Sequence, residues 1–233
     1  MFSFKVDRDY YDCKDNLFAK CTIEIEQGIT VLCGCNGSGK TTILKHIHSL
    51  CKKQHIPCIS FDNLIDGGTS SAGEAIQRGD YSFAANAITS SEGETIFLNL
   101  GQFATKMGAF VDSVVKKEKY YENPFEKVFE NPDAKKEQSF DKCFILMDAI
   151  DSGMSIDNIV IIKKLLHMVS DDILRHGIEP YVIVSANAYE VTVNEHCYDV
   201  GSCKYLAPEV TKTYDSYRKF ILKTRQRKDK RFK

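Results

Sequence analysis

The sequence predicts an α/β fold with a mostly parallel central sheet, an antiparallel β layer at the N-terminus and a helical lobe. Four continuous apolar runs are typical of strands covered on both faces. Amphipathic helical patterns follow three of these runs. Near the N-terminus, apolar residues alternate with polar ones. With 233 residues, 43% hydrophobic and 27% charged, the chain can bury a large core. We therefore expect residues 1–233 to form a single domain.

The strands are predicted from two different patterns. Residues 2–6 and 21–25 alternate apolar with polar side chains, which predicts half-buried antiparallel strands. The apolar runs are continuous, as expected for parallel strands buried on both faces. They cover residues 29–33, 56–61, 143–147 and 181–184.

Helices are predicted between and after these strands. Residues 41–53 and 157–175 have helical patterns, and an apolar stripe at steps of three and four runs from Ile96 to Val114. We expect residues 64–141 to form a helical lobe with a charged, proline-containing excursion at 119–141. Gly201-Ser202, between two short apolar segments, predicts a hairpin near the C-terminus.

Charge and cysteine content limit the possible classes of protein. The formal net charge of -1 argues against nucleic-acid or membrane binding by bulk electrostatics. We expect no membrane span and a cytoplasmic location, because no apolar run is long enough to cross a bilayer and the first residues are charged. The nine cysteines are odd in number and several lie inside apolar runs, so we expect buried, reduced thiols.

The strongest chemical signal lies between the first buried strand and the helix after it. Its glycines allow backbone N–H groups to surround phosphate oxygens, and the helix N-terminus favours negative charge. This pattern predicts a P-loop that binds ATP and Mg²⁺, with Lys40 reaching the β and γ phosphates and the Thr41 hydroxyl on Mg²⁺. The motif reads Gly34-Cys35-Asn36-Gly37-Ser38-Gly39-Lys40-Thr41.

A carboxylate ends a later strand. Asp148 follows the apolar run Phe144-Ile145-Leu146-Met147. An Asp in this position is often only a helix cap, but after a P-loop it is a Walker B candidate. We expect Asp148 to hold Mg²⁺ through water.

The P-loop together with Thr42 resembles the form found in ABC-type ATPases and in the head domains of SMC-like DNA-repair proteins. Ser90-Ser91-Glu92-Gly93-Glu94 is similar to the ABC signature, and residues 150–155 are similar to the D-loop. The resemblance implies an ATP-dependent homodimer in which Ser91 and Gly93 contact ATP bound by the other subunit. It also implies ATP contacts from Asn36, Gly37, Ser38, Gly39, Lys40, Thr41 and Thr42, and adenine stacking by Tyr11, with Tyr10 and Phe18 as competitors. The alternative for Ser91 is an N-cap serine followed by an early glutamate.

Two positions depart from the family pattern. Ala149 stands where the resemblance implies a catalytic glutamate, and Asn187 where it implies a histidine. A methyl group cannot accept a proton, and asparagine can only hydrogen-bond a phosphate. These changes predict slow ATP hydrolysis, with Lys40, Asp148 and Asn187 around the phosphates and Asp151 as the alternative catalytic carboxylate. In ABC-type ATPases a glutamine senses Mg²⁺, and this sequence has no clear equivalent of it. Gln77 and Asp62-Asn63 are the candidates.

Several readings of function stay open. The resemblance favours an ATP-dependent switch in DNA-related, mobile-element or phage processes; a transporter ATPase subunit and a P-loop kinase are the alternatives. The basic tail 219–233 can contact nucleic acid or be a solvated end, and an unidentified protein partner is also possible. The residues His196, Cys197 and Cys203 lack paired metal-ligand spacing, so we expect them to pack in the hairpin.

Overall fold

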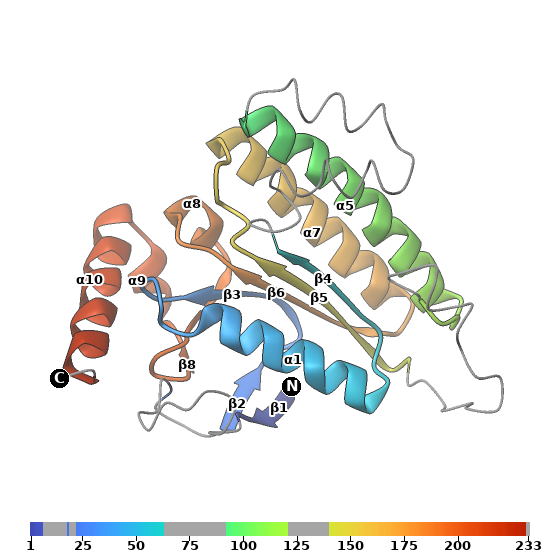
Figure 1. Ribbon diagram of the computed structural model, residues 1–233, viewed down its shortest axis with the longest axis horizontal. Helices are drawn as coiled ribbons and strands as arrows, with labels where there is room; N and C mark the ends of the chain where they lie inside the picture. The colour runs from blue at the N-terminus through green and yellow to red at the C-terminus, as the bar shows by residue number, and fades with distance from the viewer. Residues whose placement is uncertain (7–17, 19–21, 63–91, 121–139, 232–233) are drawn as a thin grey trace.

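The computed structural model describes residues 1–6, 18, 22–62, 92–120 and 140–231. Within this part of the chain a six-stranded sheet has the order β4-β5-β6-β3-β7-β8 (Figure 1). Strands β3 to β7 run parallel, and β8 pairs antiparallel with β7. This α/β architecture with a mostly parallel sheet confirms the predicted fold class.

The strand bounds follow the apolar runs closely. The parallel strands are β3 (Gly28–Cys33), β4 (Cys58–Asp62), β5 (Lys142–Asp148), β6 (Glu179–Ser185) and β7 (His196–Asp199). The short β8 (Lys204–Tyr205) forms the predicted hairpin with β7. Strands β1 (Phe2–Lys5) and β2 (Thr22–Ile25) form the separate antiparallel sheet expected from their alternating pattern.

Helices cover both faces of the sheet. Helix α1 (Lys40–Gln54) lies on one face, while α5 (Glu92–Val115) and α7 (Ile156–Arg175) lie on the other (Figure 1). The single turns α8 (Tyr189–Thr192) and α9 (Pro208–Thr211) precede the C-terminal helix α10 (Tyr214–Arg231). The sequence pattern predicts α1, α5 and α7 but not α10.

Side chains alternate between two cores because successive strand residues point to opposite faces. Phe144 and Leu146 of β5 pack toward α1 and the β1–β2 sheet. Ile145 and Met147, one position along, pack toward α5 and α7. Burial on both faces explains why these strands appear as continuous apolar runs in the sequence.

The described cysteines are free thiols, and all of them except the half-buried Cys58 are buried as expected. No helix in the described ranges combines the length and apolar character that a membrane crossing requires.

Candidate nucleotide-binding site

The predicted P-loop connects the end of β3 to the start of α1. Gly34, Gly37 and Gly39 have φ angles of 147°, 73° and 101°, which L side chains rarely adopt. A Cβ on Gly34 would lie 2.6 Å from the Ser38 hydroxyl, and the Ser38 N–H donates to the Cys35 carbonyl at 3.1 Å. The glycines are therefore required by this tight loop, whose last residues lead into the N-terminus of α1.

The side chain of Lys40 folds back over its own loop. Its Nζ donates to the Gly34 carbonyl at 2.8 Å and to Asn187 Oδ1 at 3.0 Å, and the residue is only 9% exposed. Burial lowers the pKa of Lys40, an effect that Cys33, Cys35 and the carboxylates Asp151 and Asp148 oppose. The Gly34 carbonyl and the Asn187 amide oxygen, which are both neutral, hold the ammonium against the loop.

Asp148 ends β5 beside two polar side chains of neighbouring strands. The Ser185 hydroxyl, at the end of β6, donates to Asp148 Oδ1. The Ala149 N–H donates to the same hydroxyl oxygen at 3.0 Å, so Ser185 fixes both the carboxylate and the turn after it. Asp62 is the register partner of Asp148 on β4. Ser185 was not among the predicted site residues, and the available signal was its position directly after a buried apolar run.

Ala149 occupies the turn that follows Asp148. Its φ of 50° places it in the left-handed region, which costs a non-glycine residue about 1–2 kcal/mol. The next residue, Ile150, donates its N–H to the Ser185 carbonyl at 3.3 Å. The chain therefore turns sharply here, and the side chain at 149 is a methyl group.

Asp151 joins this turn to the turn after β6. Its Oδ2 accepts hydrogen bonds from the N–H groups of Asn187 at 2.8 Å and Ala188 at 2.5 Å. Its Oδ1 is buried and has no hydrogen-bond partner among the described residues. One oxygen thus positions Asn187 for its contact with Lys40, and the other is not used for that purpose.

The remaining predicted residues differ in exposure. Asn36, Gly37 and Thr41 are exposed, Thr42 is half-buried, and the Ser38 hydroxyl is buried without a partner among the described residues. Phe18 packs against the core on the α1 face. Gly93 lies at the start of α5. The predictions for Tyr10, Tyr11, Asn63, Gln77 and Ser91 lie outside the described residues, as does most of the excursion 119–141.

Helix α10 adds contacts to the P-loop that the sequence analysis missed. The Cys35 N–H donates to Thr224 Oγ1 at 3.0 Å, and Lys228 Nζ donates to the Asn36 carbonyl at 3.0 Å. The available signal was the short apolar stripe of Tyr217, Phe220 and Ile221. The charged residues around it suggested a solvated end.

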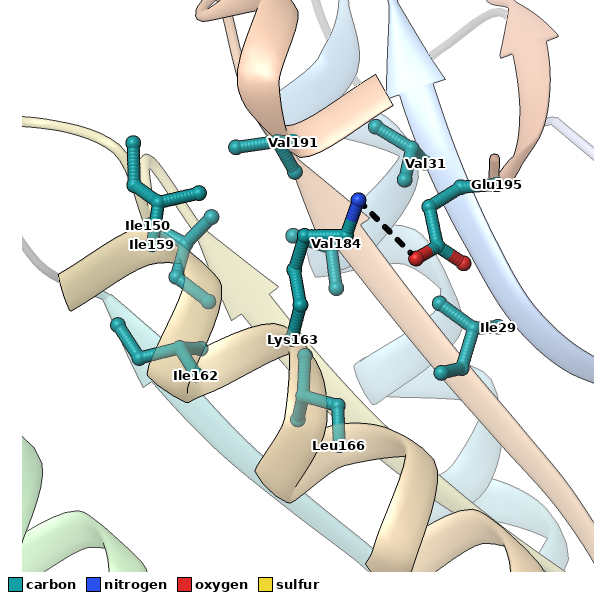
Figure 2. Close-up of a pocket in the computed structure, with 10 residues that line it drawn as sticks. All are labelled: Ile29, Val31, Ile150, Ile159, Ile162, Lys163, Leu166, Val184, Val191 and Glu195. Atoms are coloured by element: carbon teal, nitrogen blue, oxygen red, sulfur yellow. Dashed lines mark ion pairs between the residues drawn. The ribbon is translucent and has the colours of Figure 1, made fainter. Parts of the chain in front are cut away.

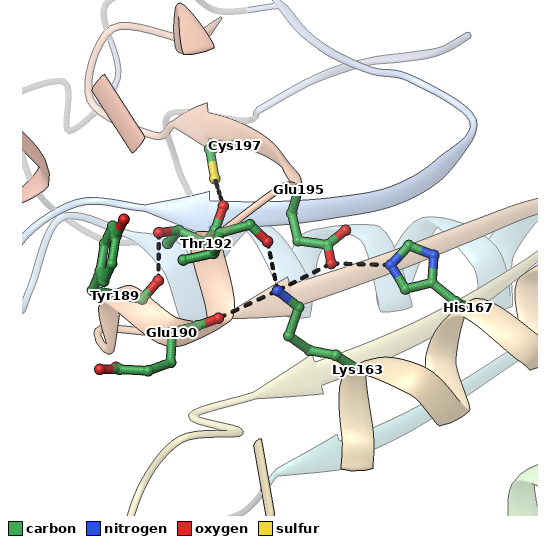
Figure 3. A network of polar contacts seen from close by, with 8 residues as sticks. Lys163, His167, Tyr189, Glu190, Thr192, Glu195 and Cys197 are labelled. Carbon is green, nitrogen blue, oxygen red and sulfur yellow. Dashed lines mark hydrogen bonds and ion pairs between the residues drawn. The ribbon is translucent and has the colours of Figure 1, made fainter. Parts of the chain in front are cut away.

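A pocket opens elsewhere, between α7 and strands β3 and β6 (Figure 2). Its lining is aliphatic except for Lys163 and Glu195, which form an ion pair with 3.3 Å between Nζ and Oε1. Glu195 Oε1 also lies 3.0 Å from His167 Nε2, and Lys163 donates to the carbonyls of Glu190 and Val193 (Figure 3). These contacts connect α7 to the segment around α8. The charges of Lys163 and Glu195 compensate each other.

The hairpin residues do not form a metal centre. His196 Nδ1 lies 3.2 Å from Glu26 Oε2, and Cys197 and Cys203 are buried free thiols. No group of three or more His, Cys, Asp or Glu side chains in the described ranges is arranged to hold a metal ion.

Comparison with known proteins gives one family. Residues 16–179, more than two thirds of the chain, match the family model described as an AAA domain. The matched range contains the P-loop, Asp148 and Asp151. No curated protein matches the chain.

Proposed function

The chain belongs to the AAA domain family of P-loop ATPases, and from this premise we propose that it is an ATP-held switch that hydrolyses ATP slowly. Membership of the family gives an ATPase-type nucleotide-binding function. The slow turnover, the switching and the partners are our proposal.

ATP binding with Mg²⁺ is supported by the residues at the end of β3. The glycine loop has the positive φ angles of a phosphate cradle, and the Lys40 ammonium is already held by the neutral oxygens of Gly34 and Asn187. Thr41 at the start of α1 and Asp148 at the end of β5 are the groups that would hold Mg²⁺. The metal would neutralise phosphate charge.

Slow hydrolysis is supported most directly by Asp151. A general base needs a carboxylate oxygen that the attacking water can reach, but Asp151 Oδ2 accepts two backbone N–H groups and Oδ1 is buried. Position 149 offers a methyl group, and Asn187 cannot act as a base. Asp62 lies beside Asp148 in the sheet register and is a further carboxylate to test.

The switch itself rests on the resemblance to ABC-type and SMC-like ATPases. In that arrangement Ser91 and Gly93 of each subunit contact ATP held by the other, which gives a two-fold homodimer. A role on DNA is the favoured use of such a clamp, and the basic residues of α10 are the candidate contacts. A transporter subunit or a kinase would use the same P-loop with other partners.

Lys40→Ala tests the ATP-binding step. Calorimetry should show that this variant loses ATP affinity in the presence of Mg²⁺ while its circular dichroism stays native. Lys45→Ala is the matched control, because Lys45 is an exposed lysine of the same helix. Equal ATP binding by the wild type and a folded Lys40→Ala variant would remove the P-loop assignment.

A further inference from the structure

The C-terminal helix α10 lies against the outside of the P-loop. Tyr217, Thr224 and Lys228 are spaced by seven and four residues, which places them on one face of the helix. Tyr217 and Thr224 are buried. The last turns of the helix contact the loop through Thr224 and Lys228, from opposite ends of the sequence.

The ammonium of Lys228 lies directly above the loop at Gly37. A Cβ added to Gly37 would be 2.5 Å from Lys228 Nζ and 3.3 Å from Cε. Nζ also donates to the carbonyl of Asn36, the preceding residue, at 3.0 Å. The missing side chain at position 37 therefore leaves room for a cation beside the phosphate cradle.

Two neighbouring basic residues near the end of α10 differ in their partners. Arg227 pairs with Asp199, whose side chain is 6% exposed, with 2.7 Å between the nitrogen and Oδ2. Lys228 has no ion pair within the described residues, and its partner is a neutral carbonyl oxygen. A lysine ammonium has three N–H donors, so the contact with Asn36 leaves others for a second acceptor.

We propose that Lys228 contacts the phosphate chain of bound ATP as a second lysine, supplied by the C-terminal helix. The proposal rests on ATP binding at the P-loop. Lys40 approaches the loop from its own helix and Lys228 from α10, so two ammonium groups reach the same loop from different elements. Hydrogen bonds between charged groups are among the strongest that side chains make, and phosphate is a preferred acceptor.

The test measures how ATP affinity depends on the positive charge of the side chain at position 228. Lys228→Met should weaken ATP binding about 10- to 100-fold in calorimetry with Mg²⁺, whereas Lys228→Arg should stay within a few-fold of the wild type. Lys223→Met is the matched control, because Lys223 is exposed on the same helix, and it should leave the affinity unchanged. The loss in Lys228→Met should be smaller at high salt, since salt screens a contact between charges.

Thermal unfolding without nucleotide separates this role from that of a latch, a contact that only holds α10 against the P-loop. A latch predicts that Lys228→Met lowers the melting temperature and leaves ATP affinity equal to that of Lys223→Met; this result would overturn the proposal. If the wild type binds ATP and Lys40→Ala does not, an unchanged Lys228→Met removes only the role of Lys228. If the wild type does not bind ATP, both proposals fail.

Discussion

Lys40 donates a hydrogen bond from Nζ to Asn187 Oδ1 at 3.0 Å, which links the P-loop to the turn after β6 across 147 positions of the chain. Asp151 holds the backbone of Asn187 through its N–H. Asp151 therefore fixes the backbone from which the Asn187 side chain reaches Lys40. A change in charge at position 187 acts directly on the lysine that is expected to meet the phosphates.

We predict that Asn187→Asp weakens ATP binding by about tenfold. A carboxylate would pair with Lys40 and repel the phosphates, and a tenfold loss corresponds to about 1.4 kcal/mol of binding free energy. Calorimetry with ATP and Mg²⁺ measures the effect. Asn194→Asp is the control, because Asn194 is exposed and precedes β7, away from the carboxyl ends of the parallel strands. Equal losses in the two variants would show that total charge, not the contact with Lys40, is responsible.

The buried Lys40 also predicts how stability changes with pH. Because burial lowers its pKa, the unfolded chain binds more protons at this site between the folded and unfolded pKa values. The free energy of unfolding should then rise with pH in the wild type relative to Lys40→Met, a trend that follows from linkage. Urea unfolding of both proteins between pH 7 and 9.5, without nucleotide, measures this difference, with Lys45→Met as control.

The upper limit of that pH range comes from the tyrosines. Burial raises the pKa of Tyr181 to about 12, so above about pH 10 the unfolded chain loses this proton first and folding becomes less stable. At pH 9.5 and below, Tyr181 stays protonated in the folded chain and largely protonated in the unfolded chain. A difference between wild type and Lys40→Met that falls as the pH rises from 7 to 9.5 would contradict the prediction.

The sequence predicted those parts of the molecule whose signal is local. Burial on both faces makes β5 a continuous apolar run, and the left-handed turns of the P-loop require glycine at 34, 37 and 39. These patterns lie within a few residues of the feature they specify. The same holds for Asp148, which follows its strand directly.

The parts that were missed depend on contacts between distant segments. The Cys35 N–H meets Thr224 Oγ1 across 189 positions, and nothing near Thr224 in the sequence indicates that contact. Helix α10 has a narrow apolar stripe among many charged residues, so its pattern is also typical of a solvated end. Ser185 is one serine after a buried strand, and only the pairing of β5 with β6 brings it near Asp148.

The dimer proposal predicts that assembly depends on ATP. Light scattering during size-exclusion chromatography should show a larger mass with ATP and Mg²⁺ than without, and Ser91→Arg should prevent the increase. Arginine would add a bulky side chain at the subunit interface, where the resemblance places ATP. Thr105→Arg is the control, because Thr105 is exposed on α5. A mass that ignores both ATP and Ser91→Arg would exclude the sandwich arrangement.

The final prediction concerns turnover and the residue after Asp148. Ala149 already has a left-handed backbone, so Ala149→Glu adds a carboxylate without demanding a new conformation. A side chain that takes a proton from the attacking water as a general base contributes roughly 10² to 10⁴ in rate. We therefore expect Ala149→Glu to raise steady-state phosphate release and to shorten the lifetime of an ATP-bound dimer. Ala149→Gln, which has nearly the same shape and cannot take a proton, should not.

Asp151→Asn completes this series. Its remaining side-chain oxygen can still accept the N–H groups of Asn187 and Ala188, so the turn should keep its geometry, and circular dichroism and thermal unfolding check this. If Asp151 only positions that turn, slow phosphate release should change little in Asp151→Asn. If Asp151 is the base, the wild type should turn over briskly, Ala149→Glu should add little, and Asp151→Asn should lose most of the rate. That second pattern would contradict our proposal of a slow, ATP-held switch, because the catalytic carboxylate would then be present two residues beyond its usual position.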